Sequence, residues 1–239
     1  MTRLYLSIAL AEGDTIALPE AAARHAVQVL RLGPGAALTL FNGAGGEFEA
    51  VLDSVGKRTA TVLVGAHRAV ERESALALTL AQCVSKGERM DYTIQKAVEL
   101  GVSCIQPLLS SRSVVKLDVQ RWEKRQERWQ GVVIAACEQC GRNRLPELLP
   151  VQALSSWLAD SEELRLVLAP GGERTLRKLP SATAASLLVG PEGGLSEDEI
   201  AATLQSGCTA VGLGPRVLRT ETAGVAALAA LQALWGDLA

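Results

Sequence analysis

The fold is decided at residues 187–199, which read LLVGPEGGLSEDE. An apolar strand at 186–189 passes directly into the turn GPEGG, and Ser196 with Glu199 then forms a capping box that opens a helix ending at Gln205. A strand that is apolar throughout is typical of the centre of a parallel sheet, because helices cover both of its faces. This strand–turn–helix unit predicts an α/β fold with a ligand crevice at the carboxyl ends of its strands.

The same alternation of strands and helices covers residues 75–239. We expect strands at 75–83, 103–108, 164–168, 186–189 and 209–213, and helices at 90–100, 118–140, 196–205 and 220–238. Gly101 and Gly207 follow two of these helices at the position where glycine commonly ends a helix. Residues 169–185 carry no strong helical pattern.

The first seventy residues instead show short strands separated by turns. We expect strands at 3–9, 37–41, 47–53 and 59–66, and one short helix at 21–32. The glycine-rich turn at 42–46 joins two of these strands as a hairpin. The polar segment HRAVERES at 67–74 is interpreted as a linker. The sequence therefore predicts a small β domain at 1–72 and an α/β domain at 73–239.

Composition excludes several classes of protein. The chain has 239 residues, of which 48% are hydrophobic and 21% charged, as in a folded rather than a disordered protein. Its nearest approach to a membrane helix, 223–234, is shorter than the roughly 18 residues that such a helix needs. The N-terminus lacks the pattern of a secretory signal, so we expect a cytoplasmic protein.

Metal binding and triad chemistry are also disfavoured. The five cysteines are thinly spread, which favours reduced thiols over a disulfide framework. Cys137 and Cys140 form CEQC inside an expected helix, with no second pair at zinc spacing. Both histidines, His25 and His67, lie in the first domain, and no serine lies in a nucleophile elbow. We therefore expect no metal site and no Ser–His–Asp triad.

The net charge of −2 is unevenly distributed. Residues 86–144 carry eleven basic and seven acidic residues, whereas 145–239 carry six and eleven. This basic middle indicates a localised anionic partner, although part of it is a solvated helix face. The residues of that face alternate in charge at helical spacing: Arg121, Glu123, Lys124, Arg125, Glu127 and Arg128. Aromatic residues make up only 3% of the chain, which argues against a stacking platform for single-stranded bases.

A second glycine-rich strand exit occurs at 211–224, which reads VGLGPRVLRTETAG. Two such loops on neighbouring parallel strands would form one pocket from backbone groups, because glycine allows a ligand to approach the main chain closely. A phosphate loop is disfavoured, since GK[ST] and GxGxxG are absent and Glu192 would repel a phosphate. The pocket therefore suits a neutral or cationic nucleoside. A plain strand-to-helix turn is the alternative for either loop alone.

These motifs together resemble the ribosomal RNA small subunit methyltransferase E family, in the SPOUT superfamily of knotted methyltransferases. The resemblance is carried by GPEGG and LGPRVLRTETA, and also by QKAVELGV at 95–102, SRSVV at 111–115 and EQCGR at 138–142. His25, the run Val29-Leu30-Arg31 and the Phe41-Asn42-Gly43 turn are similar to the family's PUA-like RNA-binding domain. The chain departs from the family at Leu4-Tyr5-Leu6, where phenylalanine is more usual, and at Cys140, where small residues such as serine are common.

The resemblance implies a parallel-sheet domain with a deep trefoil knot, preceded by a small, β-barrel-like PUA domain. It further implies a homodimer that uses S-adenosylmethionine to methylate N3 of a uridine in small-subunit ribosomal RNA, within an assembled 30S-type particle. No metal and no membrane are expected. The implied cofactor-binding residues are Leu168, Gly190, Pro191, Glu192, Gly193, Gly194, Leu213, Gly214, Leu218, Arg219 and Thr220.

Methylation at N3 sets further requirements. The base must be unpaired, because N3 lies on its pairing edge, and N3 must lose a weakly acidic proton. Arginine can stabilise the resulting anion and glutamate can accept the proton. The candidates are Arg142, Arg219 and Arg112 for the first role and Glu138 and Glu221 for the second; an orienting ion pair is the alternative for each. The residues expected to contact RNA are Arg3, His25, Arg31, Lys86, Lys96 and Arg112. Arg89, beside the expected site, is a further candidate for contact with phosphate.

Three other functions compete with this interpretation. One is a SPOUT methyltransferase that acts on another RNA position, such as a ribose 2′-hydroxyl. Another is a non-catalytic RNA-binding protein on a degenerate knot, which the intact GPEGG and LRTETA loops disfavour. A nucleotide-dependent hydrolase lacks both a phosphate loop and metal ligands.

Overall fold

The computed structural model describes residues 2–113, 118–159, 164–169, 171–172 and 174–238. They form two compact units, one comprising Met1–Glu73 and Cys137–Leu145 and the other Ser74–Ala136 and Pro146–Ala239. The first boundary lies next to the division expected at residue 72. Cys137–Leu145 was assigned to the second domain from the sequence, but it groups with the first unit.

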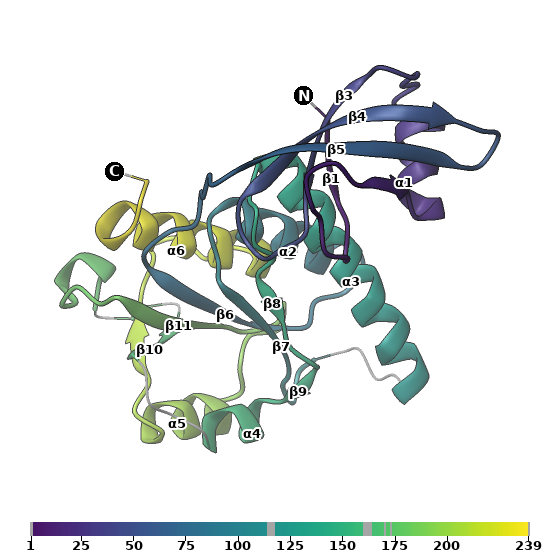
Figure 1. The fold of residues 1–239 in the computed structure, drawn as a ribbon. Coiled ribbons are helices and arrows are strands. Elements are labelled where there is room, and N and C mark those ends of the chain that lie inside the picture. The colour runs from purple at the N-terminus through teal and green to yellow at the C-terminus, as the bar shows by residue number, and fades with distance from the viewer. Residues whose placement is uncertain (1, 114–117, 160–163, 170, 173, 239) are drawn as a thin grey trace. The chain divides into compact units, whose positions relative to one another are not determined.

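The first unit is built on a five-stranded sheet of order β1-β3-β4-β5-β2 (Figure 1). Its elements are β1 (Thr2–Tyr5), β2 (Thr15–Ala17), α1 (Glu20–Arg24), the π-helix η1 (His25–Val29), β3 (Ala37–Phe41), β4 (Glu47–Val55) and β5 (Ala60–Arg68). Alternating positions of the strands supply the core, which includes Leu4, Leu40, Leu52 and Val62. The expected hairpin is present, with β3 antiparallel to β4. The expected strand at 3–9 is wrong in extent, because β1 ends at Tyr5.

The expected helix at 21–32 is also wrong in length and type. A five-residue α-helix changes at His25 into a π-helix, in which the Leu30 N–H donates to the His25 carbonyl at 3.0 Å. Arg31 then adopts a φ of 54°, a left-handed conformation that ends the helical run. Periodicity alone does not distinguish these helix types, since both present a similar apolar face over so few residues.

The polar segment 67–74 does not form the expected linker. β5 continues through Arg68, and the residues after it bond within the first unit. Arg72 donates to the Gly141 carbonyl at 2.9 Å, and Glu73 pairs with Arg142. The charged side chains of segment 67–74 therefore attach residues 141–144 to the N-terminal sheet. These contacts explain why Cys137–Leu145 groups with the first unit.

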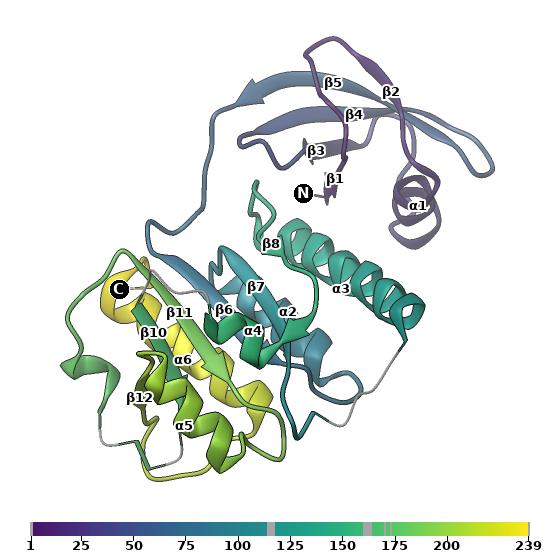
Figure 2. The same cartoon turned by 90° about the horizontal axis from the view of Figure 1, so that it is seen from below.

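The second unit contains a parallel seven-stranded sheet of order β12-β10-β11-β6-β7-β8, with β9 also paired to β7. Helices α2 and α6 cover one face and α4 and α5 the other (Figures 1 and 2). The strands are β6 (Ala77–Cys83), β7 (Cys104–Leu109), β8 (Glu147–Leu148), β9 (Gln152–Ala153), β10 (Leu164–Leu168), β11 (Ala184–Val189) and β12 (Thr209–Val211). The helices are α2 (Arg89–Glu99), α3 (Val119–Cys140), α4 (Leu154–Ala159), the 3-10 helix η2 (Leu176–Lys178), α5 (Glu197–Gln205) and α6 (Thr220–Trp235). The residues of α3 from Cys137 onward belong to the first unit.

The parallel sheet explains the apolar runs in the sequence. β6 and β11 lie in its interior and are almost wholly buried, because helices cover both faces. The short elements β8, β9 and α4 were missed because two to six residues are too few to show a period. Among the described residues, the structure contains no helix long and apolar enough to cross a membrane.

One expectation about the sheet is corrected. The two glycine-rich loops follow β11 and β12, which were expected to be neighbours, but β10 lies between them. The exit of β10 at Leu168 therefore contributes to the same edge as the two loops. This places three strand ends, rather than two, around one region.

The chain after β10 packs closely against the end of β12. The Ala169 N–H donates to the Val211 carbonyl at 3.1 Å, and the Gly212 N–H donates to the Arg174 carbonyl at 2.9 Å. A Cβ atom placed on Gly172 would lie 2.8 Å from the Gly212 nitrogen, and one on Gly212 would lie 2.6 Å from the Gly172 oxygen. The two backbone segments can approach this closely because both residues are glycine.

Candidate functional site

A cavity of about 680 Å³ opens where β10, β11 and β12 end and α6 begins. Ten of the eleven residues expected to bind a cofactor line it: Leu168, Gly190, Pro191, Glu192, Gly194, Leu213, Gly214, Leu218, Arg219 and Thr220. Gly193 is not among the lining residues; its carbonyl accepts a hydrogen bond from Arg112 Nη1 at 2.9 Å. The structure thus brings together residues from three separate segments of the sequence, at 168, 190–194 and 213–220.

A buried chain of hydrogen bonds fixes the position of α6 relative to the turn after β11. Gln82 Nε2 donates to Thr220 Oγ1 at 2.9 Å, and Thr220 Oγ1 donates to the Gly190 carbonyl at 2.6 Å. Gly224 allows this approach, since a Cβ atom there would lie 3.3 Å from Gln82 Oε1. Gln82 was missed in the sequence analysis, although a polar residue near the end of an otherwise apolar strand is a usable signal.

Charged side chains converge on one side of the cavity. Arg89, the first residue of α2, donates to Glu192 Oε1 at 2.8 Å and lies 3.7 Å from Glu221 Oε1. The Lys86 N–H also donates to Glu192, at 2.9 Å. Burial alone would raise the pKa of Glu192, but the Lys86 N–H and the Arg89 guanidinium outweigh it and lower that pKa. Arg89, which was expected to contact phosphate, is instead paired with two carboxylates.

The outer side of the 190–194 turn contacts the segment after β7. Arg112 donates to the carbonyls of Gly193 and Leu195, and the Ser111 N–H donates to Glu199 at 2.6 Å. Glu199 also completes the predicted capping box with Ser196, as expected. Burial pushes the pKa of Glu199 up, but the hydrogen bonds from Ser196 and Ser111 together hold it below its ordinary value. Val114 and Val115 of the SRSVV motif lie outside the described residues.

The cavity has the composition of a small-molecule site. Apolar residues such as Val167, Leu213 and Leu218 line it, together with residues of the two glycine-rich loops, whose backbone N–H and C=O groups can form directional polar contacts with a ligand. Arg219 and Glu221 lie at the start of α6 and also line the cavity. Glu221 Oε2 is buried and has no hydrogen-bond partner among the described residues. Such an arrangement can hold a planar ring and place a cation and a carboxylate beside it.

The other two catalytic candidates, Glu138 and Arg142, belong to the first unit and do not line the cavity. Glu138 Oε1 accepts the Tyr5 N–H at 2.9 Å; burial raises the pKa of Glu138, and that hydrogen bond opposes the rise. Arg142 is only 5% exposed, and its Nε and Nη2 donate to Glu73 Oε2 at 3.0 and 2.5 Å. Both side chains are therefore engaged in the packing of the first unit.

The residues expected to contact RNA fall into two groups. Arg3 and Lys96 are engaged internally: Arg3 lies 2.5 Å from Glu47, donates to Asn143 and is 12% exposed, and Lys96 pairs with Glu99 at 2.8 Å. The exposed group comprises His25, Arg31, Lys86 and Arg112. Because these four residues are exposed, a phosphate in solution can reach them.

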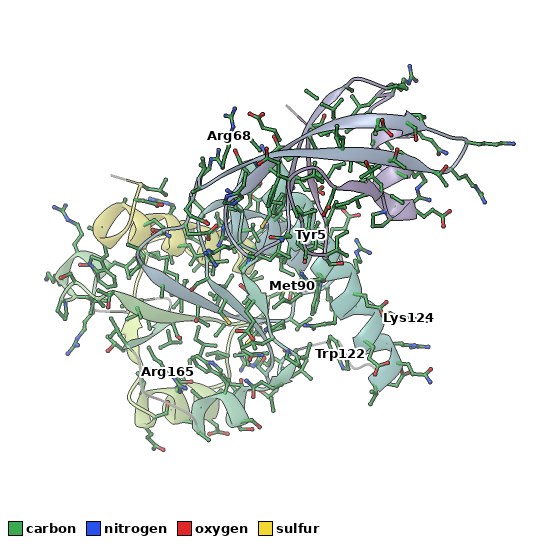
Figure 3. All side chains as sticks on the ribbon, in the orientation of Figure 1. Tyr5, Arg68, Met90, Trp122, Lys124 and Arg165 are labelled. Carbon is green, nitrogen blue, oxygen red and sulfur yellow. The ribbon has the colours of Figure 1, made fainter. Side chains whose placement is uncertain are left out.

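Helix α3 carries four of the eleven basic residues in the basic middle of the chain. Arg121 lies 3.5 Å from Asp118, Arg128 pairs with Asp91, and Arg125 lies over the rings of Trp122 and Trp129. Figure 3 shows Lys124, which is exposed, on the same helix. The interpretation of part of this region as a solvated helix face is consistent with these pairs.

The cysteines do not form a reactive or metal-binding cluster. All five are free thiols, and burial raises the pKa of Cys83 and of Cys137 to about 12. Such thiols remain protonated at neutral pH and are poor nucleophiles. Among the residues that the structure describes, no group of three or more His, Cys, Asp or Glu is placed to hold a metal ion.

Comparison with known proteins adds to this geometry. Residues 72–232 match the RNA methyltransferase domain family, and residues 18–65 match the RNA methyltransferase PUA domain family. The chain is 34% identical to a ribosomal RNA small subunit methyltransferase E from Buchnera aphidicola, over 99% of this chain and 97% of that protein. It is 31% identical to the Bacillus subtilis protein of the same description, over 92% and 90%.

Two solved structures share the whole fold. One is a Legionella pneumophila protein in complex with the bound cofactor SAM, with 43% identity, a TM-score of 0.97 and 99% of both chains covered. The other is a ribosomal RNA small subunit methyltransferase E from Neisseria gonorrhoeae bound to S-adenosyl methionine, with 41% identity, a TM-score of 0.93 and both chains fully covered.

Proposed function

Because this chain belongs to the ribosomal RNA small subunit methyltransferase E family, we propose that it transfers the methyl group of S-adenosylmethionine to N3 of a uridine in small-subunit ribosomal RNA. The observation that carries the proposal is the cavity shared by three strand exits and the start of α6, with Arg219 and Glu221 in its wall. The cofactor bound in the two similar structures supports the choice of ligand.

The residues present fit S-adenosylmethionine. Leu213 and Leu218 offer apolar contact to the adenine ring, and the backbone of the 190–194 turn offers hydrogen bonds. The Glu221 side chain lines the cavity and is 15% exposed, so its negative charge suits a positively charged molecule there. When bound, S-adenosylmethionine supplies a methyl group on a positively charged sulfur.

The chain's own residues would prepare the base for methylation. N3 of uridine must lose its proton before its electron pair can attack, and Glu221 is assigned as the acceptor of that proton. Arg219, at the N-cap of α6, is assigned to stabilise the negative charge that develops on the base. We assign Arg142 and Glu138 to the packing of the first unit rather than to catalysis, since their partners are Glu73 and Tyr5.

RNA is expected to contact both units. Lys86 and Arg112 flank the 190–194 turn, where they would hold phosphates of the nucleotides around the target base. His25 and Arg31 in the first unit would contribute further contacts. An N3 atom is accessible only in an unpaired or flipped base, so the RNA must present the uridine outside a helix. An assembled 30S-type particle is the proposed substrate.

The proposal also includes a knotted chain, a homodimer and a cellular location. The close crossing of the segments at 172 and 212 is consistent with a trefoil knot in the second unit. A homodimer is proposed through the end of α6, where Leu234 is 40% exposed, whereas Leu228 and Leu231 are buried within their own unit. The cytoplasm is the proposed location, since a cytoplasmic enzyme meets ribosomal RNA and keeps its thiols reduced.

The decisive test is to identify the methylated nucleoside. Purified protein and labelled S-adenosylmethionine are incubated with small ribosomal subunits that lack their native modifications, and the RNA is then digested. N3-methyluridine is the expected product, whereas a 2′-O-methylated nucleoside would replace the proposal with ribose methylation. Cofactor binding without transfer would point to another RNA or assembly stage, and absence of binding would favour a non-catalytic RNA-binding protein.

Replacing Arg31 by glycine is expected to change stability and RNA binding in opposite directions. Arg31 is the one non-glycine residue with positive φ in the described part of the chain, so glycine there should raise the free energy of unfolding by up to about 1 kcal/mol. Loss of the charge should weaken binding to the small subunit and lower the salt slope of log K by about 1. Denaturation and salt-dependent binding titrations measure the two effects.

The Arg31→Lys variant is the matched control, because it keeps both the charge and the left-handed backbone. We expect its RNA affinity to stay within about twofold of the unchanged protein. If R31G were more stable but bound RNA with unchanged affinity and salt slope, Arg31 would not be an RNA contact.

A further inference from the structure

Arg89 lies where a cation is electrostatically unfavourable. It is the first residue of α2, and the N-terminal turn of a helix carries partial positive charge. Two carboxylates from other elements compensate for this, Glu192 after β11 and Glu221 at the start of α6. The Arg89 guanidinium therefore connects the 190–194 turn with the start of α6, which carries Glu221, the assigned proton acceptor.

The two oxygens of Glu221 have different surroundings. Oε1 lies 3.7 Å from Arg89 Nε, whereas Oε2 is buried and has no hydrogen-bond partner among the described residues. The Glu221 side chain is 15% exposed and lines the cavity. The contact of Oε1 with Arg89 and the burial of Oε2 together fix the Glu221 carboxylate in the cavity wall.

We propose that Arg89 is a positioning residue for methyl transfer: its contact with Glu221 Oε1 holds that carboxylate in the cavity wall, oriented to take the N3 proton of the target uridine. This inference rests on the proposed function. In the step that Arg89 prepares, the N3–H bond breaks and its proton passes to the Glu221 carboxylate. The N3 electron pair forms a bond to the methyl carbon, and the electron pair of the broken carbon–sulfur bond stays on sulfur.

Arg89 is expected to contribute little to the free energy of unfolding. Its side chain is 40% exposed, and ion pairs of exposed arginines add little to folding. Replacing Arg89 by methionine, which keeps much of the aliphatic stem, should therefore lower the melting temperature by no more than about 4 °C. The dissociation constant of S-adenosylmethionine should stay within about threefold, since the apolar walls and loop backbone remain.

The rate of methyl transfer should fall much more. We expect kcat of Arg89→Met to fall about 100-fold, as for a catalytic group displaced by about 1 Å, with the KM for small subunits changed less than threefold. Arg89→Lys should recover part of the loss, because an ammonium can reach one carboxylate at a time. Arg128→Met is the matched control: it also removes an arginine paired with an acid, Asp91 of α2, and should leave kcat within about twofold.

A double-mutant cycle tests whether Arg89 acts through Glu221. Glu221→Gln alone should lower kcat about 100- to 1000-fold, and adding Arg89→Met should lower it no further. A multiplicative loss in the double variant would overturn the positioning role while leaving Glu221 as the acceptor. A raised KM for the RNA with unchanged kcat in Arg89→Met would make Arg89 a phosphate contact instead. Full activity of Glu221→Gln would remove both the acceptor assignment and the inference, whatever the effect of Arg89→Met.

Discussion

Replacing Arg142 by alanine is expected to lower the free energy of unfolding of the first unit by about 3–5 kcal/mol. Arg142 is 5% exposed and places two nitrogens on the Glu73 carboxylate, which is itself 21% exposed. Removing the guanidinium leaves a largely buried carboxylate without its counter-charge, and that is more costly than the loss of an exposed pair. Methylation should fall as a consequence of this unfolding rather than of lost chemistry.

The measurement must report on the first unit itself. The four tryptophans lie at positions 122, 129, 157 and 235, outside that unit, so tryptophan fluorescence would follow the second unit. Hydrogen exchange of the backbone amides in β3, β4 and β5 is the suitable probe, because it gives local opening free energies. Those amides should lose protection in Arg142→Ala, while the amides of β6 and β11 keep theirs.

A compensated variant separates structure from catalysis. Replacing both members of the pair, as in Glu73→Leu with Arg142→Met, removes the two charges together and should restore most of the stability. If methylation recovers with stability, Arg142 is a structural residue. A stable double variant without activity would instead return Arg142 to the catalytic residues, as the sequence analysis first suggested.

The second large effect is expected at Gly172. A Cβ atom there would lie 2.8 Å from both the Gly212 nitrogen and the Val211 carbonyl carbon, which are backbone atoms and cannot rotate away. Gly172→Ala should therefore cost about 3 kcal/mol of stability in the second unit. It should also raise the dissociation constant of S-adenosylmethionine about 10- to 100-fold, since Ala169 and Val211 beside the clash line the cavity.

Gly171→Ala is the matched control on the neighbouring residue. Gly171 has a φ of 78°, but no heavy atom lies within 4 Å of the position its Cβ would take. Alanine there should cost about 1 kcal/mol through backbone strain alone and leave cofactor affinity unchanged. Calorimetric binding and thermal unfolding compare the two variants. Equal effects at 171 and 172 would show that contact between the two backbone segments does not determine the shape of the cavity.

The sequence predicts the glycine-rich loops of the site well, but not the polar and charged residues whose partners are distant in the chain. The glycine-rich loops were identified locally, because a buried strand, a GPEGG turn and a capping box are adjacent in the chain. Gln82 and the carboxylate pairing of Arg89 were not, since their partners lie more than one hundred residues away. Hydrophobic residues recur at a spacing that indicates a helix or a strand, but no spacing in the sequence indicates the partner of a charged residue. Arg89 was therefore expected to contact phosphate on the basis of its charge alone.

The sequence by itself determined the alternation of strands and helices in the second unit, the hairpin of the first, and the two loops that line the cavity. These features follow from contacts between near neighbours in the chain: burial pattern, capping and turn chemistry. Only the tertiary structure decided that β10 separates β11 from β12, that Cys137–Leu145 groups with the first unit, and that Glu221 rather than Glu138 lies in the cavity wall. Strand order and long-range ion pairs depend on which distant segments bury their surfaces together, and the local pattern of residues does not specify that choice.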